Sequence, residues 1–328
     1  MKIFVTGGTG FIGSHLVKAL VSEGNQVFVL TSKKEKIKEV ENLGAEAVLG
    51  HLKSLAFLKK VLKGIEEVYH LAAIRDRWGT NRQEYQEVNV LGTKNLLEAS
   101  KKNKIKHFIF CSSVTVLGYP EETPICESSP CVPKTLYGQS KHQAEQLVKR
   151  YQKKGLPTTI IRPTVAYGPG DTAGMMLKLC KLVKEKKFKI VGNGKNRLHL
   201  IYVDDLINGL FLARNPRTFG QTYILTYKNS ITVNELVKLV ASILKVKISL
   251  QYVPLRFAKI VGFLMENFYY VVRIKKEPLV TRSKVDLFTK NQIYDVSKAK
   301  KELGFSSKIG YREGVKKTIH WYKKNRII

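Results

Sequence analysis

Residues 1–13 have the sequence MKIFVTGGTGFIG, an apolar run followed directly by a glycine-rich turn. A helical pattern begins at Ser14, so the order of elements is strand, turn and helix. Gly7, Gly10 and Gly13 permit a tight turn, close approach of the backbone to a pyrophosphate, and close packing of the helix on the strand. The helix would direct its N-terminal amides and the positive end of its dipole toward the phosphates. The stretch therefore predicts a dinucleotide-binding site.

Apolar segments alternate with helical patterns through the first half of the chain, which indicates βαβ units and a parallel sheet. We expect an α/β protein with a doubly wound Rossmann sheet. Residues 1–165 would form the NAD(P)-binding domain, and residues 166–328 mainly a smaller C-terminal α/β substrate-binding lobe. Strands are expected near residues 2–5, 26–30, 46–49, 67–71, 107–112 and 158–161. Helices are expected near residues 13–23, 53–63, 83–102, 136–153, 175–186, 205–213, 233–244, 254–272, 297–303 and 311–325.

A second informative segment is YGQSK at residues 137–141. Tyr137 and Lys141 are four residues apart, so they share one face of a helix. A phenol has an unperturbed pKa of about 10, and a neighbouring ammonium lowers that pKa by favouring the phenolate. Upstream, the apolar run FIFC predicts a buried strand that ends in Ser112 and Ser113. The serine, tyrosine and lysine together indicate a proton-transfer site beside the dinucleotide site.

These motifs resemble the extended short-chain dehydrogenase/reductases of the NAD-dependent epimerase/dehydratase family, nearly end to end. The nearest branches are the hydroxysteroid dehydrogenase and dihydroflavonol reductase group and the nucleotide-sugar epimerases. In this family, segments of the C-terminal lobe return to the Rossmann domain. The motifs that carry the resemblance are the glycine turn, HLAA (70–73), NVLGT (89–93), Ser113 five residues before Gly118, Tyr137 with Lys141, RPTVAYGPG (162–170), YVDD (202–205) and SKAKKELGF (297–305).

The resemblance implies a role for each catalytic candidate. Tyr137 would be the general acid/base at a secondary alcohol or ketone, and Lys141 would lower its pKa and hold the nicotinamide ribose. Ser113 would hydrogen-bond the reacting oxygen, with Ser112 as the second candidate for that role. Asn89 would support the active-site helix. Further residues implied in cofactor binding are Gly7, Gly10, Phe11, Ile12, Gly13, Ser32, Lys33, Leu52, Leu71, Ala72, Ala73, Pro163 and Val165, together with Tyr137 and Lys141.

The end of the second predicted strand bears on the choice between NAD and NADP. NAD-dependent members of this fold usually place an Asp there to bind the ribose diol. This chain has Thr31, Ser32, Lys33 and Lys34 instead, and hydroxyl and ammonium groups suit a 2′-phosphate better. We therefore favour NADP over NAD. His51 stands where relatives often have an acidic residue at the adenine, and we interpret it as an ordinary loop residue.

Two departures from family patterns narrow the reaction. Sugar 4,6-dehydratases carry an Asp-Glu pair after the catalytic serine or threonine, whereas this chain has Val114 and Thr115, which argues against that activity. Arg197 is a candidate for gripping a substrate diphosphate, although its register is unusual, and Tyr167 is a second substrate-binding candidate. His199 is interpreted as a structural strand residue.

Three functions remain open at this point. The first is a dehydrogenase or reductase acting on a sterol-like, isoprenoid or sugar-derived secondary alcohol or ketone. The second is a nucleotide-sugar epimerase with tightly bound NAD. The third is a non-enzymatic nucleotide sensor or RNA-binding protein on the same scaffold, which only the charge favours. The resemblance also implies a homodimer that packs helices near residues 83–102 and 136–153.

Composition is that of a globular protein, with 44% hydrophobic and 25% charged residues. The four cysteines, Cys111, Cys126, Cys131 and Cys180, form no CxxC pair. With no secretion signal, we expect reduced thiols, a cytoplasmic protein and no metal site. The net charge of +31 comes from lysines spread over many helices. It is consistent with a solvated surface or with attraction to nucleotides, anionic lipid or nucleic acid.

Residues 255–272 are apolar but contain Arg256, Lys259 and Glu266, so they do not form a comfortable transmembrane span. The apolar side chains fall at helical spacing. We interpret the segment as a helix facing the core of the smaller lobe. The alternative is an interfacial helix that meets a membrane or an apolar substrate, and Arg273, Lys275 and Lys276 beside it fit an anionic membrane surface.

Overall fold

The computed structural model describes residues 1–76, 78–274 and 276–328. Its larger lobe is built on a parallel sheet of seven strands in the order β11-β6-β5-β4-β1-β2-β3. This is the doubly wound Rossmann order with one further strand, β11, beside β6. The predicted fold class is confirmed. The strands are β1 (Lys2–Thr6), β2 (Gln26–Thr31), β3 (Glu46–Leu49), β4 (Glu67–His70), β5 (His107–Cys111), β6 (Thr158–Pro163) and β11 (Thr222–Leu225).

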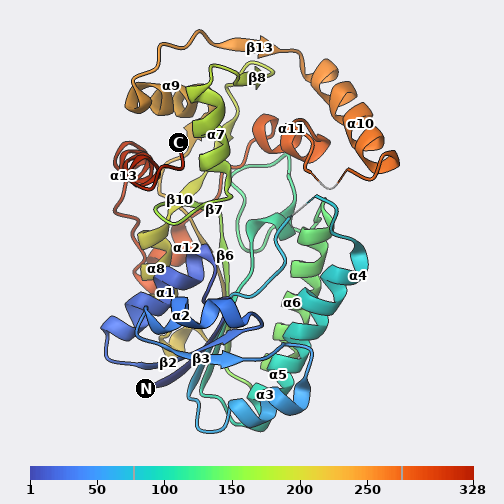
Figure 1. Cartoon of the computed structure of the whole chain (residues 1–328). Helices are drawn as coiled ribbons and strands as arrows, with labels where there is room; N and C mark the ends of the chain where they lie inside the picture. The colour runs from blue at the N-terminus through green and yellow to red at the C-terminus, as the bar shows by residue number, and fades with distance from the viewer. Residues whose placement is uncertain (77, 275) are drawn as a thin grey trace.

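Alternate side chains of the strands enter two separate helical layers. Ile3 and Val5 belong to a core that includes residues of helices α1 and α8, whereas Phe4 belongs to the core formed with α3, α5 and α6. Because helices cover both faces, β4 and β5 are buried along their whole length. Figure 1 shows the two layers on opposite sides of the sheet. The helices are α1 (Phe11–Ser22), α3 (Leu55–Val61), α5 (Gly92–Lys102), α6 (Leu136–Lys153) and α8 (Val203–Leu212).

The smaller lobe lies at the top of Figure 1, beyond the carboxyl ends of the strands. Outside the large sheet, the chain forms three pairs of short strands: β7 (Val165–Tyr167) with β10 (Leu200–Tyr202), β8 (Lys189–Val191) with β13 (Gln251–Val253), and β9 (Arg197–Leu198) with β12 (Ile231–Thr232). The helices of the smaller lobe are α7 (Met175–Lys184), α9 (Val233–Leu244), α10 (Leu255–Val271), α11 (Arg282–Thr289) and α13 (Tyr311–Lys324), while α12 (Ser297–Leu303) packs near β11.

The strand predictions agree with the structure to within two residues at each end. The predicted helix at 83–102 is instead α4 (Arg82–Tyr85), a π-helical turn over Gln86–Leu91, and α5. Two short helices were not predicted, α2 (Ile37–Glu41) and α11. Both are brief and rich in charged residues, so their apolar periodicity is weak.

The interpretation of residues 255–272 as a core-facing helix is wrong. Within α10, Ala258 and Gly262 are buried, but Phe257, Leu264 and Phe268 are each 59% exposed. These three side chains therefore point away from the lobe. Among the described residues, no helix has both the length and the hydropathy needed to cross a bilayer.

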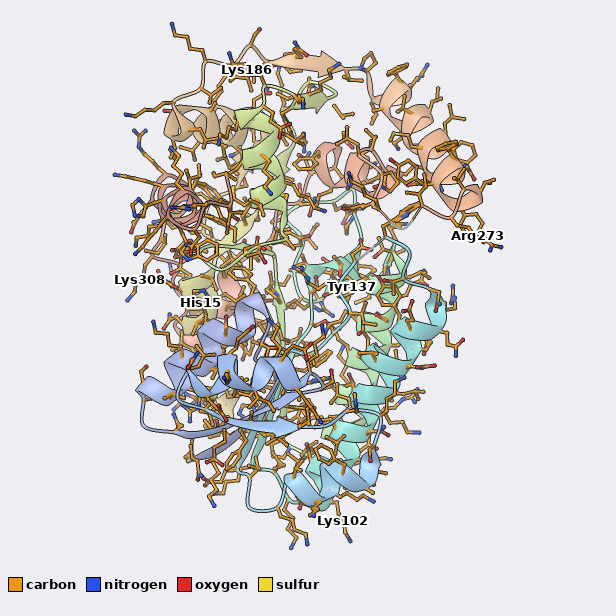
Figure 2. All side chains as sticks on the ribbon, in the orientation of Figure 1. His15, Lys102, Tyr137, Lys186, Arg273 and Lys308 are labelled. Carbon is orange, nitrogen blue, oxygen red and sulfur yellow. The ribbon has the colours of Figure 1, made fainter. Side chains whose placement is uncertain are left out.

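The positive charge is spread over the whole surface. Lys102, Lys186, Arg273 and Lys308 are all exposed, and Figure 2 shows them projecting from widely separated parts of the molecule. This distribution agrees with the pattern of lysines along the sequence. Charge alone therefore does not single out one face as a binding surface.

Candidate active site

The glycine turn between β1 and α1 has no room for side chains. Gly7 has a φ of +75°, and a Cβ there would lie 2.6 Å from the backbone nitrogen of Ala72. A Cβ on Gly13 would lie 2.0 Å from the carbonyl oxygen of Gly7. Gly10 is the N-cap of α1, and among the described residues no side chain caps this helix. Its first backbone N–H groups are open to an anion, as expected for a pyrophosphate.

A cavity of about 350 Å³ opens beside the glycine turn, at the carboxyl ends of β1 and β2. It brings together five of the predicted cofactor residues. It also recruits lysines and His51, which had been interpreted as an ordinary loop residue. In the part of the chain that the structure describes, no carboxylate lines it. The lining residues are Gly7, Thr9, Leu30, Thr31, Ser32, Lys33, Lys36, Gly50, His51, Leu52, Lys53, Ala72 and Val88.

These residues fit a nicotinamide dinucleotide. The cradle of glycines and the uncapped helix would hold the pyrophosphate. Thr31 ends β2, Ser32 and Lys33 follow it, and the three would meet the adenosine ribose. The remaining predicted cofactor residues lie close in sequence to strand ends of the same sheet edge or the start of α1: Phe11 and Ile12 in α1, Leu71 and Ala73 after β4, and Pro163 and Val165 at the junction of β6 and β7.

A chain of buried hydrogen bonds connects the glycine turn to the helix layer. Thr93 donates its hydroxyl proton to the carbonyl of Asn89 at 2.6 Å, so it accepts from Nε2 of His70 at 2.8 Å. Nδ1 of His70 then accepts from the Thr6 hydroxyl at 2.6 Å, and Thr6 accepts from the backbone N–H of Ala72. Burial lowers the pKa of His70 to about 3, so its ring is neutral. The network fixes one tautomer and anchors the loop after β4.

Asn89 connects that loop to the helix carrying the tyrosine. It lies in the π-helical turn, and its side chain is buried. Its Oδ1 accepts from the backbone N–H of Ile74 at 2.8 Å, while its Nδ2 donates to the Ile74 carbonyl and, at 2.9 Å, to Ser140 Oγ. Ser140 in turn donates to the carbonyl of Tyr137 at 2.7 Å. The contacts match a supporting role, and π-helical turns frequently occur at functional sites.

Tyr137 lies in the first turn of α6, and its N-cap Thr135 accepts from the backbone N–H of Gly138. Burial raises the pKa of the Tyr137 phenol, the nearby Cys111 thiol also raises it, and a hydrogen bond with Ser113 lowers it. Ser113 is the N-cap of the short 3₁₀ turn after β5, where it accepts from the N–H of Thr115. The structure thus brings Tyr137 and Ser113 together.

Ser112 and Lys141 have different surroundings from Ser113. Ser112 Oγ is buried, and among the described residues it has no hydrogen-bond partner. Lys141 is 2% exposed, and its ammonium donates to the carbonyl of Cys111 at 2.6 Å and lies 4.1 Å from the centre of the Phe110 ring. Burial lowers the pKa of Lys141 to about 8. The ammonium is therefore held by a carbonyl dipole and an aromatic face.

The two predicted substrate-binding residues, Tyr167 and Arg197, differ in whether a substrate could reach them. Tyr167 is 1% exposed and packs edge-to-face on Tyr202 within the core, so its ring is not available to a substrate and that prediction is wrong. Arg197 is exposed, and its guanidinium donates to the hydroxyl and carbonyl of Ser230 at 2.7 and 3.0 Å. His199 is buried, and its Nδ1 accepts from the N–H of Tyr294. This supports its interpretation as structural.

One cluster has the residue types of a metal site. Ligand atoms of Cys131, His142 and Glu145 lie within 4.8 Å of one another. Both oxygens of Glu145 accept from the guanidinium of Arg162, at 2.9 and 2.7 Å, and the same guanidinium lies 3.4 Å from Cys131 Sγ. The Arg162 guanidinium already pairs with both oxygens of the Glu145 carboxylate, and its positive charge would repel a metal cation. The cluster is a buried ion pair that holds β6 against α6.

The comparison with known proteins covers nearly the whole chain. The model of the NAD dependent epimerase/dehydratase family matches residues 3–224. The chain is 28% identical over 318 residues to the 4-hydroxy-2-methyl-3-oxo-4-farnesyl-3,4-dihydroquinoline-1-oxide ketoreductase of Stigmatella aurantiaca, covering 96% of this chain and 95% of that protein. It is also 28% identical over 325 residues to the N-acetyl-alpha-D-glucosaminyl-diphospho-ditrans,octacis-undecaprenol 4-epimerase of Escherichia coli O157:H7, covering 98% and 95%.

The comparison with solved structures agrees with the sequence comparison. The crystal structure of UDP-glucuronic acid 4-epimerase from Bacillus cereus in complex with NAD matches with a TM-score of 0.80 and 25% identity, over 99% of both chains. The family match spans more than half of the chain, and it includes the glycine turn, Ser113 and Tyr137. The protein therefore belongs to the NAD-dependent epimerase/dehydratase family and is an NAD(P)-dependent enzyme of the extended short-chain dehydrogenase/reductase type.

Proposed function

We propose that the protein interconverts a ketone and a secondary alcohol, with Tyr137 as the general acid/base. The observation that carries this proposal is that the Ser113 side chain lies close enough to the Tyr137 phenol to lower its pKa, at the end of β5 in the same sheet that carries the glycine turn after β1. Val114 follows Ser113 and is buried, and Thr115 comes next, so no carboxyl acid/base stands where 4,6-dehydration needs one. The substrate class is a sterol-like, isoprenoid or sugar-derived carbonyl compound.

The chain's own groups supply the proton and orient the reacting oxygen. Ser113 would donate a hydrogen bond to the substrate oxygen, and the Tyr137 phenol would give that oxygen its proton. The hydride is supplied or accepted by a nicotinamide cofactor when one is bound. Lys141 would hold the nicotinamide ribose and place a positive charge near the phenol. Asn89 keeps the loop after β4 and the first turn of α6 in register.

The protonation states favour the reductive direction at neutral pH. Burial raises the pKa of Tyr137, so its phenol is protonated and ready to act as a donor. The pKa of Lys141 is lowered to about 8, so most molecules carry the ammonium at pH 7. A protonated phenol suits the reduction of a ketone, because it can give its proton to the substrate oxygen. Oxidation of an alcohol would require the same phenol to lose its proton first.

The charge around the cavity supports NADP as the preferred cofactor. Lys36 is paired with Glu39 at 2.6 Å, whereas among the described residues the Lys33 ammonium has no carboxylate partner. An unpaired ammonium and the Ser32 hydroxyl after β2 suit a 2′-phosphate. The absence of a lining carboxylate within the described residues removes the group that usually binds the ribose diol of NAD.

A nucleotide-sugar epimerase with tightly bound NAD is the second candidate. The similarity to the Escherichia coli and Bacillus cereus epimerases over at least 95% of each chain favours it. Such an enzyme would oxidise a sugar carbon and reduce it again without releasing its cofactor. We further propose a homodimer packed through α5 and α6. A monomeric mass by light scattering at micromolar concentration would contradict that assembly.

The cofactor carried by the purified protein separates the two candidates. The protein would be denatured, and any released nicotinamide nucleotide would be identified by mass spectrometry. The emptied protein would then be titrated with NADPH and NADH. A cofactor-free protein that binds NADPH at least 10-fold more tightly supports a reductase that exchanges its cofactor. Stoichiometric NAD that survives purification supports the epimerase and contradicts the proposed role of Lys33.

A Tyr137→Phe variant tests the assigned acid/base. We expect kcat to fall at least about 10²-fold, because the proton donor is removed. The dissociation constant for the cofactor should stay within about threefold. Tyr252→Phe is the matched control, since Tyr252 is an exposed tyrosine on β13. Full turnover by Tyr137→Phe would overturn the mechanism.

A further inference from the structure

Helix α10 is amphipathic, and only its narrow face contacts the protein. Gly262 is buried against α11, where an added Cβ would lie 3.2 Å from the backbone nitrogen of Arg282. Glu266 accepts from the backbone N–H and from the guanidinium of Arg282, each at 2.7 Å. Lys259 pairs with Asp286 of α11 at 3.5 Å. These contacts hold α10 firmly on α11 and fix which side faces outward.

The outward face is a continuous stripe of large apolar side chains. Its members are separated by three, four, four and three residues, so they align along one side of the helix. Their exposed fractions run from 58% to 77%, which is unusual for so many neighbouring apolar residues. We call this set the apolar stripe: Phe257, Ile260, Leu264, Phe268 and Val271.

Further exposed hydrophobic side chains surround the apolar stripe and enlarge the apolar surface. Eleven of the fifteen exposed large hydrophobic side chains of the described residues lie between residues 252 and 279. The rest of the exposed surface has few such side chains, so the concentration is local to α10 and its flanks. The members outside the stripe are Tyr252, Leu255, Phe263, Tyr270, Val272 and Leu279.

Three cations at the ends of α10 are unpaired within the part of the chain that the structure describes. Among the described residues, no ion pair engages Arg256, Arg273 or Lys276. Glu266 is the acidic residue of α10, and it is turned inward, with its side chain 16% exposed and paired to Arg282. An apolar stripe bordered by free cations and free of carboxylates is the pattern of a helix that lies in the interface of an anionic bilayer.

We propose that α10 docks this enzyme on the surface of an anionic phospholipid bilayer, with the apolar stripe inserted among the acyl chains. A second copy of the chain is a poorer occupant. Two stripes packed together would bring two sets of Arg256, Arg273 and Lys276 into contact on molecules that each carry a net charge of +31. A spanning arrangement is disfavoured because, among the described residues, no helix can cross a bilayer.

The docked helix also lies beside the rim of the candidate active site. The Tyr269 ring meets the edge of Trp78, with centroids 6.4 Å apart, and Trp78 Nε1 donates to the carbonyl of Ile274 at 3.2 Å. Trp78 follows the loop that Asn89 anchors at Ile74. In Figure 2, Arg273 projects at the outer end of α10 and Tyr137 lies deeper between the lobes. If the proposed function holds, docking would bring a bilayer-dissolved carbonyl substrate to this rim.

Vesicle co-sedimentation tests the proposal without any turnover. Full-length protein would be mixed with two kinds of vesicle. One is phosphatidylcholine alone, and the other contains about 40% phosphatidylglycerol, which gives its surface a negative potential. We expect tight binding to the anionic vesicles and at least 10-fold weaker binding to the neutral ones. An Ile260→Gln/Leu264→Gln/Phe268→Gln variant, altered only at exposed positions, should lose at least 10-fold in affinity while keeping its melting temperature and NADPH binding.

Charge reversal separates a local docking site from the general attraction of a basic protein. Arg256→Glu/Arg273→Glu/Lys276→Glu should weaken binding at least 10-fold. Lys316→Glu/Lys323→Glu/Lys324→Glu on α13 changes the net charge equally at exposed positions and should leave binding within about threefold. Equal losses in both variants, or no sedimentation of the wild type, would overturn the proposal. So would a stripe variant that binds vesicles normally but loses a dimer by light scattering. NADPH binding, measured on the same samples, reports the proposed function separately.

Discussion

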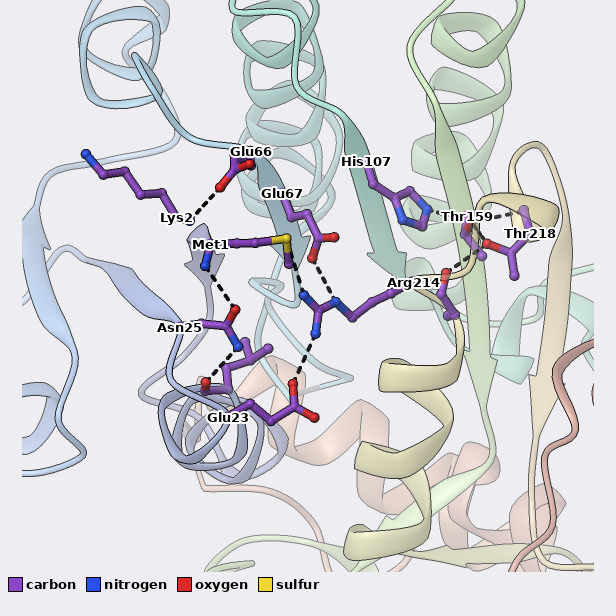
Figure 3. A network of polar contacts seen from close by, with 12 residues as sticks. Met1, Lys2, Glu23, Asn25, Glu66, Glu67, His107, Thr159, Arg214 and Thr218 are labelled. Carbon is purple, nitrogen blue, oxygen red and sulfur yellow. Dashed lines mark hydrogen bonds and ion pairs between the residues drawn. The ribbon is translucent and has the colours of Figure 1, made fainter.

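Two cations, the partly buried Arg214 and the buried Lys141, lie at opposite ends of the same sheet and are stabilised in opposite ways. At the amino ends of the strands, the guanidinium of Arg214 donates to Glu67 at 3.0 Å and to Glu23 at 3.1 Å (Figure 3). At the carboxyl ends, the ammonium of Lys141 meets the Cys111 carbonyl and the ring of Phe110. One cation has two carboxylate partners, and the other is held by neutral groups.

The difference separates the end of the sheet that ion pairs stabilise from the end to which we assign the chemistry. Arg214 connects the end of α8 to β4 and α1, and its charge does not titrate near neutral pH. Lys141 bears the cost of burial without a counter-charge at contact distance, and its pKa falls to about 8 as a result. A cation held by neutral partners keeps its donor capacity for a ligand. The fold thus places this ammonium at the carboxyl ends of the strands, the sheet edge that also carries the glycine turn.

The largest expected effect comes from replacing the catalytic-end cation. Lys141→Met should lower kcat at least about 10²-fold, because the positive charge near the phenol and the ribose contact are both lost. The same change should raise the free energy of unfolding at pH 7 by about 1–3 kcal/mol, since a shift from 10.5 to about 8 corresponds to a burial penalty of that order. Steady-state kinetics and urea unfolding on one preparation measure both. Loss of stability together with activity would show that Lys141 is structural.

At the amino ends of the strands, replacing Arg214 should lower stability and leave activity nearly unchanged. Arg214→Met leaves Glu67 largely buried without its partner, and we expect a loss of about 2 kcal/mol in the free energy of unfolding. Activity should stay within about twofold, because the change lies at the far end of the sheet. Glu23→Gln is the matched control. Its side chain is 51% exposed, so removing that arm of the network should cost no more than about 0.5 kcal/mol. A comparable loss in both variants would contradict the assigned hierarchy.

The sheet and the positions of the candidate site residues could be predicted from the sequence because their signals are local. Strands buried on both faces are short continuous apolar runs, and glycines that have no room for a Cβ stand out in a strand-turn-helix context. The i, i+4 spacing of Tyr137 and Lys141 placed both on α6. It did not reveal that Lys141 would contact the Cys111 carbonyl, because that contact depends on how α6 packs against β5.

The missed features depend on long-range packing. Lys36, His51 and Lys53 join the cavity because the loops after β2 and β3 meet at one sheet edge, which spacing along the chain does not show. Tyr167 lies in the RPTVAYGPG motif, yet its ring enters the core against Gly314 of α13. Helical periodicity predicted that α10 is an amphipathic helix, but periodicity alone does not tell whether its apolar side chains face the core or the surroundings.

The pH dependence of stability gives the smallest and most specific test of the comparison. The folded-state pKa of Lys141 is about 8 and its unfolded value is near 10.5, so between these values the unfolded chain holds a proton that the folded chain has released. The free energy of unfolding therefore gains up to about 1.4 kcal/mol per pH unit from this group as pH rises from 8 toward 10.5. Below pH 8 both the folded and the unfolded state are protonated at Lys141, so this group adds no pH dependence to the free energy of unfolding.

Subtracting the free energies of unfolding of Lys141→Met from those of the wild type should isolate this rise. Subtracting those of Arg214→Met should give no slope between pH 8 and 10.5, since a guanidinium stays charged throughout. A flat difference for Lys141→Met would mean that water or a carboxylate already compensates this ammonium, and the contrast between the two ends of the sheet would disappear.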